Sequence, residues 1–199
     1  MKESRIPYSM PMARARRAGL KTQTRRIFKL PRGHFWDEAQ GGMGSGNIES
    51  DKWPGWWHIS EFRCPFGQPG DILLPIEPWR APAEFDSLPP SQIPTGTPIW
   101  LDANGQAPAG FGRYRHARFM PKHLIVARDE LVANHVERLH DISEGDAREE
   151  GWPHHLPSDP RGYTSPCQWY AELWQQINGP GSWGTNPWVW VLEFKVLVP

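Results

Sequence analysis

Residues 19–26, which read Gly-Leu-Lys-Thr-Gln-Thr-Arg-Arg, decide the fold around the candidate site. Ser9 can cap a short helix that continues to Ala18, because a serine hydroxyl accepts from the free amides of a first helical turn. Gly19 can end this helix, since glycine adopts the left-handed conformation at little cost. The sequence therefore predicts that Lys21 lies in a turn directly after a helix.

The residues after Lys21 add a hydroxyl and a second cation to this turn. Thr24 and Arg26 are two residues apart, so on a strand they share one face, and Lys21 can join them from the turn. Burial and the neighbouring charges of Arg25 and Arg26 would lower the pKa of Lys21. Such an amine can act as a base for the Thr24 hydroxyl, and Arg26 can orient a ligand. The alternative is a solvated basic turn.

The composition excludes several classes of protein. The chain has 199 residues, with 22 Lys and Arg against 22 Asp and Glu, so it carries no bulk charge for holding nucleic acid. Two cysteines exclude a disulfide scaffold. Because 22 Pro and 19 Gly occur together with 12 Trp, we expect long but ordered loops packed by indole rings.

The neutral total conceals two segments of opposite charge. Residues 1–33 contain ten basic residues and one acid, whereas residues 129–150 contain eight acids and two arginines. A second basic cluster lies at residues 113–122. The two segments either neutralise each other in the fold or form a basic cleft for a phosphate-bearing or nucleobase ligand.

The remaining pattern predicts an α+β fold rich in short strands. Pro75 makes the strand at residues 72–77 an edge or bulged one. Further strands are predicted at 99–101, 124–127, 131–139 and 188–196, and helices at 143–151 and from 165 to the Gly179 stop. The helix from residue 165 presents Trp169, Leu173 and Ile177 on one face. We expect a small, partly open β-barrel with helices at its ends, and long loops rich in Pro, Gly and Trp at about 31–69 and 80–112.

The sequence carries few of the common catalytic and metal-binding motifs. Cys64 and Cys167 stand alone, and His154-His155 has no partner at ligand spacing, so we expect no metal and no cofactor. It has no nucleophile elbow, phosphate loop or dinucleotide fingerprint. The Gly-rich stretch 41–46 is interpreted as a linker.

The tryptophans have two interpretations. Trp53, Trp56 and Trp57 either form the small core of a long loop or stack on an unpaired base. Trp188 and Trp190 are interpreted as core residues of the last strand. The first seven residues lack the apolar segment of a signal peptide and no run is long enough to cross a membrane, so we expect a cytoplasmic protein.

The 19–26 stretch resembles the ASCH-domain family, a branch of the PUA-like β-barrels. The family signature is Gly-x-Lys-x-x-Thr-x-Arg, matched here by Gly19, Lys21, Thr24 and Arg26. Residues 143–151 resemble the short helix of the family that ends in a glutamate, and residues 188–194 resemble its last strand. The resemblance implies a single PUA-like domain over residues 1–199, with insertions at the two long loops.

The loops resemble those of phage-type members of this family. Residues 64–71, Cys-Pro-Phe-Gly-Gln-Pro-Gly-Asp, are close to the phage-type pattern Cys-Pro-Tyr-Gly-x-Pro-Gly-Asp. The strand that follows in those members contains Arg-Glu-Thr-Trp. This chain keeps Glu77 and Trp79 of that pattern but has Ile76 and Pro78 at the other two positions.

The resemblance implies an amidohydrolase that removes the acyl group from N(4)-acetylcytidine. Carried over by position, Thr24 is the nucleophile, Lys21 its base and Glu150 the group that holds or protonates the cytosine amine. A water activated by Lys21 is an equal alternative to Thr24. We assign Arg26, Glu77 and Trp79 to substrate binding.

Two other functions stay open. PUA-like domains are commonly inferred to bind RNA or a modified base, so the partner is either a small nucleoside or RNA. A ribonuclease is less supported, because the sequence has no catalytic His pair or metal cluster.

Overall fold

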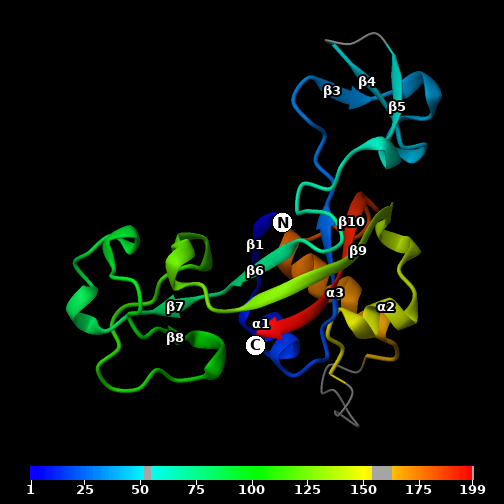
Figure 1. The fold of residues 1–199 in the computed structure, drawn as a ribbon. Helices are drawn as coiled ribbons and strands as arrows, with labels where there is room; N and C mark the ends of the chain where they lie inside the picture. Colours follow the sequence, from blue (N-terminus) through cyan, green and yellow to red (C-terminus); the bar gives the residue numbers. More distant parts are fainter. Residues whose placement is uncertain (52–54, 154–162, 199) are drawn as a thin grey trace.

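The computed structural model describes residues 1–51, 55–153 and 163–198 of an α+β protein. Its central sheet has five strands in the order β1-β6-β9-β10-β2 (Figure 1). The bounds are Glu3–Pro7 for β1, Ile72–Ile76 for β6, Arg128–Arg138 for β9, Trp188–Val198 for β10 and Gln23–Ile27 for β2. β1 runs parallel to β6, and the other neighbours are antiparallel.

Strand β10 forms the centre of the hydrophobic core. The predicted apolar face is buried at Trp190, Leu192 and Phe194, and the opposite face is equally buried at Val189 and Val191. The strand is confirmed and extends to Val198. This part of the strand is therefore covered on both faces of the sheet.

The three predicted helices are confirmed. They are α1 (Met10–Arg17), α2 (Glu144–Glu149) and α3 (Pro166–Asn178). Ser143 and Asp146 form a capping box at the start of α2, and Ser165 accepts the amide of Gln168 at the start of α3. Ser9 precedes α1 as expected, but its side chain accepts no amide, so the predicted cap bond is wrong.

The predicted helix face of α3 is partly wrong. Trp169 is buried as expected, but Ile177 is exposed, and the inner side of the helix is completed by Tyr170 and Trp174. The helix thus presents two aromatic residues, spaced four apart, to the region beside β2.

Strand β6 is internal, so the prediction that Pro75 makes it an edge or bulged strand is wrong. The amide of Ile72 donates to Lys2 O on the β1 side, so by alternation the nitrogen of Pro75 faces β9. The β6–β9 pairing ends at Leu73, before Pro75 is reached. The missing N–H of Pro75 therefore breaks no ladder bond.

The predicted strand at 124–127 is also wrong. Residues Lys122–Leu124 form a 3-10 turn, and the strand begins at Arg128. From there β9 runs to Arg138, in agreement with the predicted strand at 131–139.

The two long loops contain small sheets of their own. Strands β3 (His34–Trp36), β4 (Asn47–Ser50) and β5 (Trp56–His58) form one, and β7 (Trp79–Arg80) pairs with β8 (Trp100–Leu101), which confirms the predicted strand at 99–101. Figure 1 shows the two units projecting from the central sheet in different directions. Short 3-10 turns lie at Glu38–Gln40, Gly42–Gly44, Ile59–Glu61, Ala83–Phe85, Pro90–Gln92, Asp102–Asn104, Ala117–Phe119, Lys122–Leu124 and Leu139–Asp141.

Aromatic rings hold the first of these units in place. Trp57 packs against His34, with ring centroids 6.0 Å apart, and the Trp188 indole donates to Met43 O at 2.6 Å. The stretch 41–46 is not a plain linker, because Gly42–Gly44 forms a 3-10 turn between β3 and β4. Trp53 and the side chain of Trp56, for which packing and base stacking are the two interpretations, lie outside the described residues.

The central sheet is open in the described part of the chain. Its edge strands are β1 and β2, and neither pairs with the other through its backbone. They approach at one end, where Arg26 Nη2 donates to Pro7 O at 2.7 Å. No helix among the described residues is long and apolar enough to cross a bilayer.

A buried ion pair fastens α1 to the sheet and gives a prediction about stability. Arg16 donates to both carboxylate oxygens of Asp129, at 2.8 and 2.6 Å, and both side chains are almost fully buried. Arg16→Met should lower the free energy of unfolding by about 3–5 kcal/mol, because it leaves a buried carboxylate unpaired. Urea unfolding measures this difference.

The double variant Arg16→Met/Asp129→Leu should recover most of that loss, since no buried charge is left. Lys122→Met, which removes an exposed partner of Glu3, should leave the unfolding midpoint nearly unchanged. A loss below about 1 kcal/mol in Arg16→Met would contradict the structural role of this ion pair.

Candidate active site

The candidate site is built around Lys21, whose side chain is completely buried. Gly19 adopts a φ of 72° after α1, so the chain turns and Lys21 forms a β-bridge with Glu150. Lys21 Nζ donates to Glu150 Oε2 at 2.5 Å, to Gln23 O at 2.8 Å and to Glu150 O at 3.1 Å. All three ammonium protons of Lys21 therefore have acceptors.

Glu150 reaches Lys21 because of how α2 ends. Glu150 is the last residue of this helical turn, and Gly151 follows with a φ of 107°. A Cβ on Gly151 would lie 2.9 Å from the Cβ of Ala15 on α1. The glycine thus permits the close approach of the two helix ends that places Glu150 beside Lys21.

The second carboxylate oxygen of Glu150 is held from the other side. Tyr170 Oη donates to Glu150 Oε1 at 3.2 Å, and Arg25 Nη1 does so at 3.3 Å. Arg25 also donates to Glu137 Oε1 at 2.7 Å and to Gln23 Oε1 at 3.2 Å. Glu150 is therefore fixed by two cations and a phenol.

Thr24 lies on β2 opposite Leu192 of β10 and is 2% exposed. Its hydroxyl forms no hydrogen bond with any residue that the structure describes. It lines the same cavity as Lys21 and Glu150. An unengaged hydroxyl beside a lysine–glutamate pair is available to react with a ligand in this cavity.

These side chains border a small cavity of about 110 Å³. This volume is below the usual range of small-molecule sites, so a ligand would fill it with its reacting group and extend through its mouth. The lining residues come from β2, the helices and the end of β1: Pro7, Tyr8, Ser9, Met12, Lys21, Thr24, Arg25, Arg26, Ile27, Glu150, Tyr170, Leu173, Trp174, Ile177 and Asn178. The structure thus brings the predicted residues Lys21, Thr24, Arg26 and Glu150 together.

Burial and neighbouring charges set the electrostatics of the site. Burial lowers the pKa of Lys21 below its ordinary value, and Arg26 and Arg25 act in the same direction, while the Glu150 carboxylate opposes them. Burial also raises the pKa of Tyr170, with Glu150 adding to the effect. The net direction for Lys21 is therefore a pKa below the ordinary lysine value.

A second cavity adjoins the first and shares Pro7, Arg26, Ile27 and Asn178 with it. Its volume is about 570 Å³, and its charged lining residues are Arg26, Lys29 and Arg63. No acidic residue of the described chain lines it. Aromatic rings, including those of Phe62 and Trp190, form its walls.

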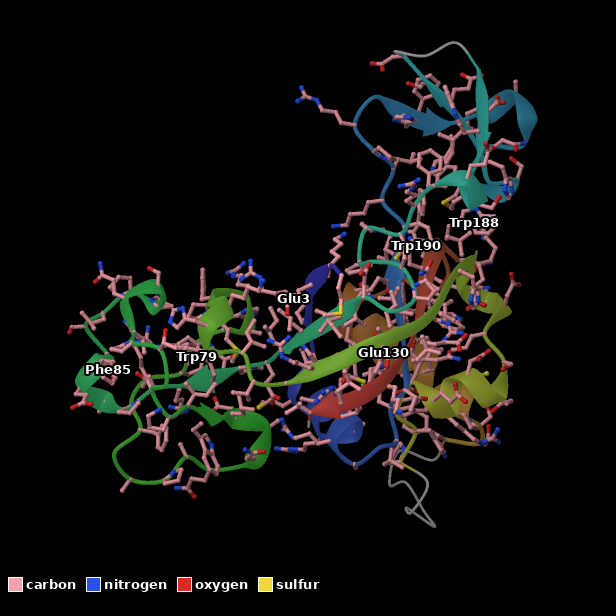
Figure 2. The ribbon with its side chains drawn as sticks, in the orientation of Figure 1. Glu3, Trp79, Phe85, Glu130, Trp188 and Trp190 are labelled. Carbon is pink, nitrogen blue, oxygen red and sulfur yellow. The ribbon has the colours of Figure 1, made fainter. Side chains whose placement is uncertain are left out.

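Glu77 and Trp79 do not line the candidate pocket. Glu77 pairs with the Arg17 guanidinium of α1, and burial raises its pKa. Trp79 is completely buried in the β7–β8 unit beneath Arg115, far from Trp190 in the central sheet (Figure 2). The prediction that these two residues bind substrate in the pocket of Lys21 is therefore not supported by their positions, because each is occupied by a contact elsewhere.

Four residues of the site were not assigned to it from the sequence. Arg25 was interpreted as a neighbouring charge but contacts Glu150 directly. Tyr8, Tyr170 and Trp174 line the pocket, and the four-residue spacing of the last two is the signal that indicates a shared helix face. Nothing local in the sequence marks Tyr8.

In the described part of the chain, no three metal-binding side chains gather. Cys64 and Cys167 are free thiols, and His154 and His155 lie outside the described residues. The chain matches no family model, no curated protein and no solved structure.

The contacts predict different stabilities for two substitutions in the site. Glu150→Ala should lower the free energy of unfolding by about 3–5 kcal/mol, because it leaves Lys21 and Arg25 buried without their shared carboxylate. Thr24→Val should change it by no more than about 1 kcal/mol, since the hydroxyl has no hydrogen bond to lose. Urea unfolding monitored by tryptophan fluorescence measures both, and equal losses in the two variants would contradict the described network.

Proposed function

We propose that the protein is a metal-free amidohydrolase that removes the acyl group from N(4)-acylated cytosine nucleosides. The observation that carries the proposal is the buried Lys21–Glu150 contact of 2.5 Å, in a cavity that the unengaged hydroxyl of Thr24 also lines. The match of residues 19–26 to the ASCH signature supports the same activity. We also propose that the central sheet is the partly open barrel of a PUA-like domain, with the Arg26–Pro7 contact at its gap.

The Lys21–Glu150 pair supplies the proton transfers that amide hydrolysis requires. Passing one proton from Lys21 to Glu150 across their contact leaves a neutral amine and a carboxylic acid. The amine accepts the Thr24 proton as the oxygen bonds to the acyl carbon, and the acid protonates N4 as the carbon–nitrogen bond breaks. The pair is then ionised again, and cytidine leaves.

Water completes the reaction in the same pocket. A second proton exchange between Lys21 and Glu150 lets the amine deprotonate water, which attacks the acyl carbon of the Thr24 ester. The Glu150 acid returns a proton to the Thr24 oxygen as the acyl–oxygen bond breaks, and the carboxylic acid product leaves. In the alternative route, the water attacks the amide directly and Thr24 only positions it. Acylation of Thr24 during turnover, detected by peptide mass spectrometry, separates the two routes.

The proposal predicts the activity of three proteins. The wild type should release cytidine from N(4)-acetylcytidine, followed by ultraviolet absorbance, and a chelator should not reduce the rate. Lys21→Met should reduce kcat by about 10²–10⁴-fold, the contribution of a general base. If Thr24 is the nucleophile, Thr24→Val should reduce kcat at least as much as Lys21→Met does.

Arg17→Gln is the matched control, because it alters a cation of α1 whose partner is Glu77, outside the pocket. It should keep wild-type turnover. Wild-type turnover in both Lys21→Met and Thr24→Val would contradict the proposal, as would the absence of cytidine release by the folded wild type across a panel of N(4)-acylcytidines.

The second candidate function is a binding module for RNA or a modified base. The adjoining cavity favours it, because Arg26, Lys29 and Arg63 face a space that no acidic residue of the described chain lines. Cations along an aromatic groove are typical of proteins that hold single-stranded nucleic acid.

This candidate predicts salt-dependent binding. Affinity for a single-stranded oligonucleotide, measured by fluorescence anisotropy, should fall as salt rises, because bound phosphates release counterions. Lys29→Ala/Arg63→Ala should weaken binding and reduce the salt dependence. An affinity that does not change with salt, or no binding at all, would contradict this function.

A further inference from the structure

Three residues that line the pocket carry buried hydrogen-bond donors without partners. They are Tyr8 Oη, Arg26 Nε and Trp174 Nε1, and none has a hydrogen bond within the described chain. Tyr8 is only 4% exposed and Trp174 only 3%. Buried polar groups are nearly always paired in folded proteins, so a cluster of unpaired ones in one pocket indicates a ligand.

The three groups lie next to the proposed catalytic residues. The Tyr8 ring centroid is 5.7 Å from Lys21 Nζ and 5.6 Å from Arg26 Cζ. Trp174 packs on Tyr170, with centroids 6.2 Å apart, and the hydroxyl of Tyr170 contacts Glu150. The three donors therefore belong to side chains that line the same cavity as Lys21 and Thr24.

The type of each group limits the ligand. A tryptophan Nε1–H and an arginine Nε–H can only donate, and the Tyr8 phenol can donate as well. Burial raises the pKa of Tyr8, which keeps its proton in place. The ligand must therefore present acceptor atoms to this part of the pocket.

We propose that Tyr8 and Trp174, together with Arg26, bind the acceptor atoms of the N(4)-acylcytosine and so select a 2-oxopyrimidine. This inference rests on the proposed function. The acylated base has three acceptors, namely ring N3, the oxygen at ring position 2 and the acyl oxygen, to match three donors. An N(6)-acyladenine carries a similar amide but has no oxygen at position 2, so one donor would stay unpaired and the base would be rejected.

The arrangement predicts opposite effects on stability and binding. Tyr8→Phe removes only an unpaired oxygen, so the melting temperature should stay the same or rise. The same variant should bind N(4)-acetylcytidine about tenfold more weakly by calorimetry, with a higher KM. Trp174→Phe should also weaken binding, and both variants should discriminate less against N(6)-acetyladenosine.

Two variants serve as matched controls. Tyr170→Phe also removes a phenol oxygen from this pocket, but one that donates to Glu150, so it should lower the melting temperature. Trp79→Phe removes an equally unpaired indole N–H outside the pocket and should leave affinity for N(4)-acetylcytidine unchanged.

The outcomes separate this inference from the proposed function. If the wild type binds N(4)-acetylcytidine without hydrolysing it, and Tyr8→Phe and Trp174→Phe weaken that binding, the inference is supported and the proposed function is overturned. If Tyr8→Phe and Trp174→Phe both hydrolyse N(4)-acetylcytidine with wild-type affinity and KM, the proposed function is supported and the inference is overturned. A wild type that neither binds nor hydrolyses N(4)-acetylcytidine overturns both.

Discussion

The contact between Lys21 and Glu150 joins two segments that are 129 residues apart in the chain, the turn after α1 and the end of α2. Its geometry depends on two glycines, Gly19 and Gly151, each with a positive φ where a helix ends. The buried pair is satisfied by Gln23, Arg25 and Tyr170, so it costs less to bury than an isolated pair of charges. The remainder of the candidate site is arranged around this contact.

The charge pattern of the chain follows from this arrangement. Three basic residues of the segment 1–33 pair with acids of the segment 129–150. The pairs are Arg16 with Asp129, Lys21 with Glu150, and Arg25 with Glu137. The pairing also leaves Arg26 and Lys29 beside cavities rather than against carboxylates. The structure thus shows ion pairs between the two segments and also a cavity lined by Arg26, Lys29 and Arg63.

Local sequence signals predict the helices and the residues that meet in the site. Long-range packing places the residues that those signals do not identify. Capping residues and a glycine stop locate α2 and α3, and the spacing of Lys21, Thr24 and Arg26 predicts that they meet. The effect of Pro75 depends on where β9 stops pairing with β6, which no local pattern in the sequence shows. Glu77 and Trp79 contact Arg17 and Arg115, which are distant in sequence. Tyr8 directly follows the edge strand β1 and lines the pocket.

The central claim is that Lys21 acts as a base and is more than one half of an ion pair. Chemical rescue tests it directly, in a Lys21→Ala protein that circular dichroism shows to be folded. Added alkylamines should restore hydrolysis of N(4)-acetylcytidine, and the restored rate should follow the concentration of the neutral amine as pH is varied. A rate that follows the ammonium ion, or no restoration by any small amine, would contradict the claim and leave Lys21 with a structural role alone.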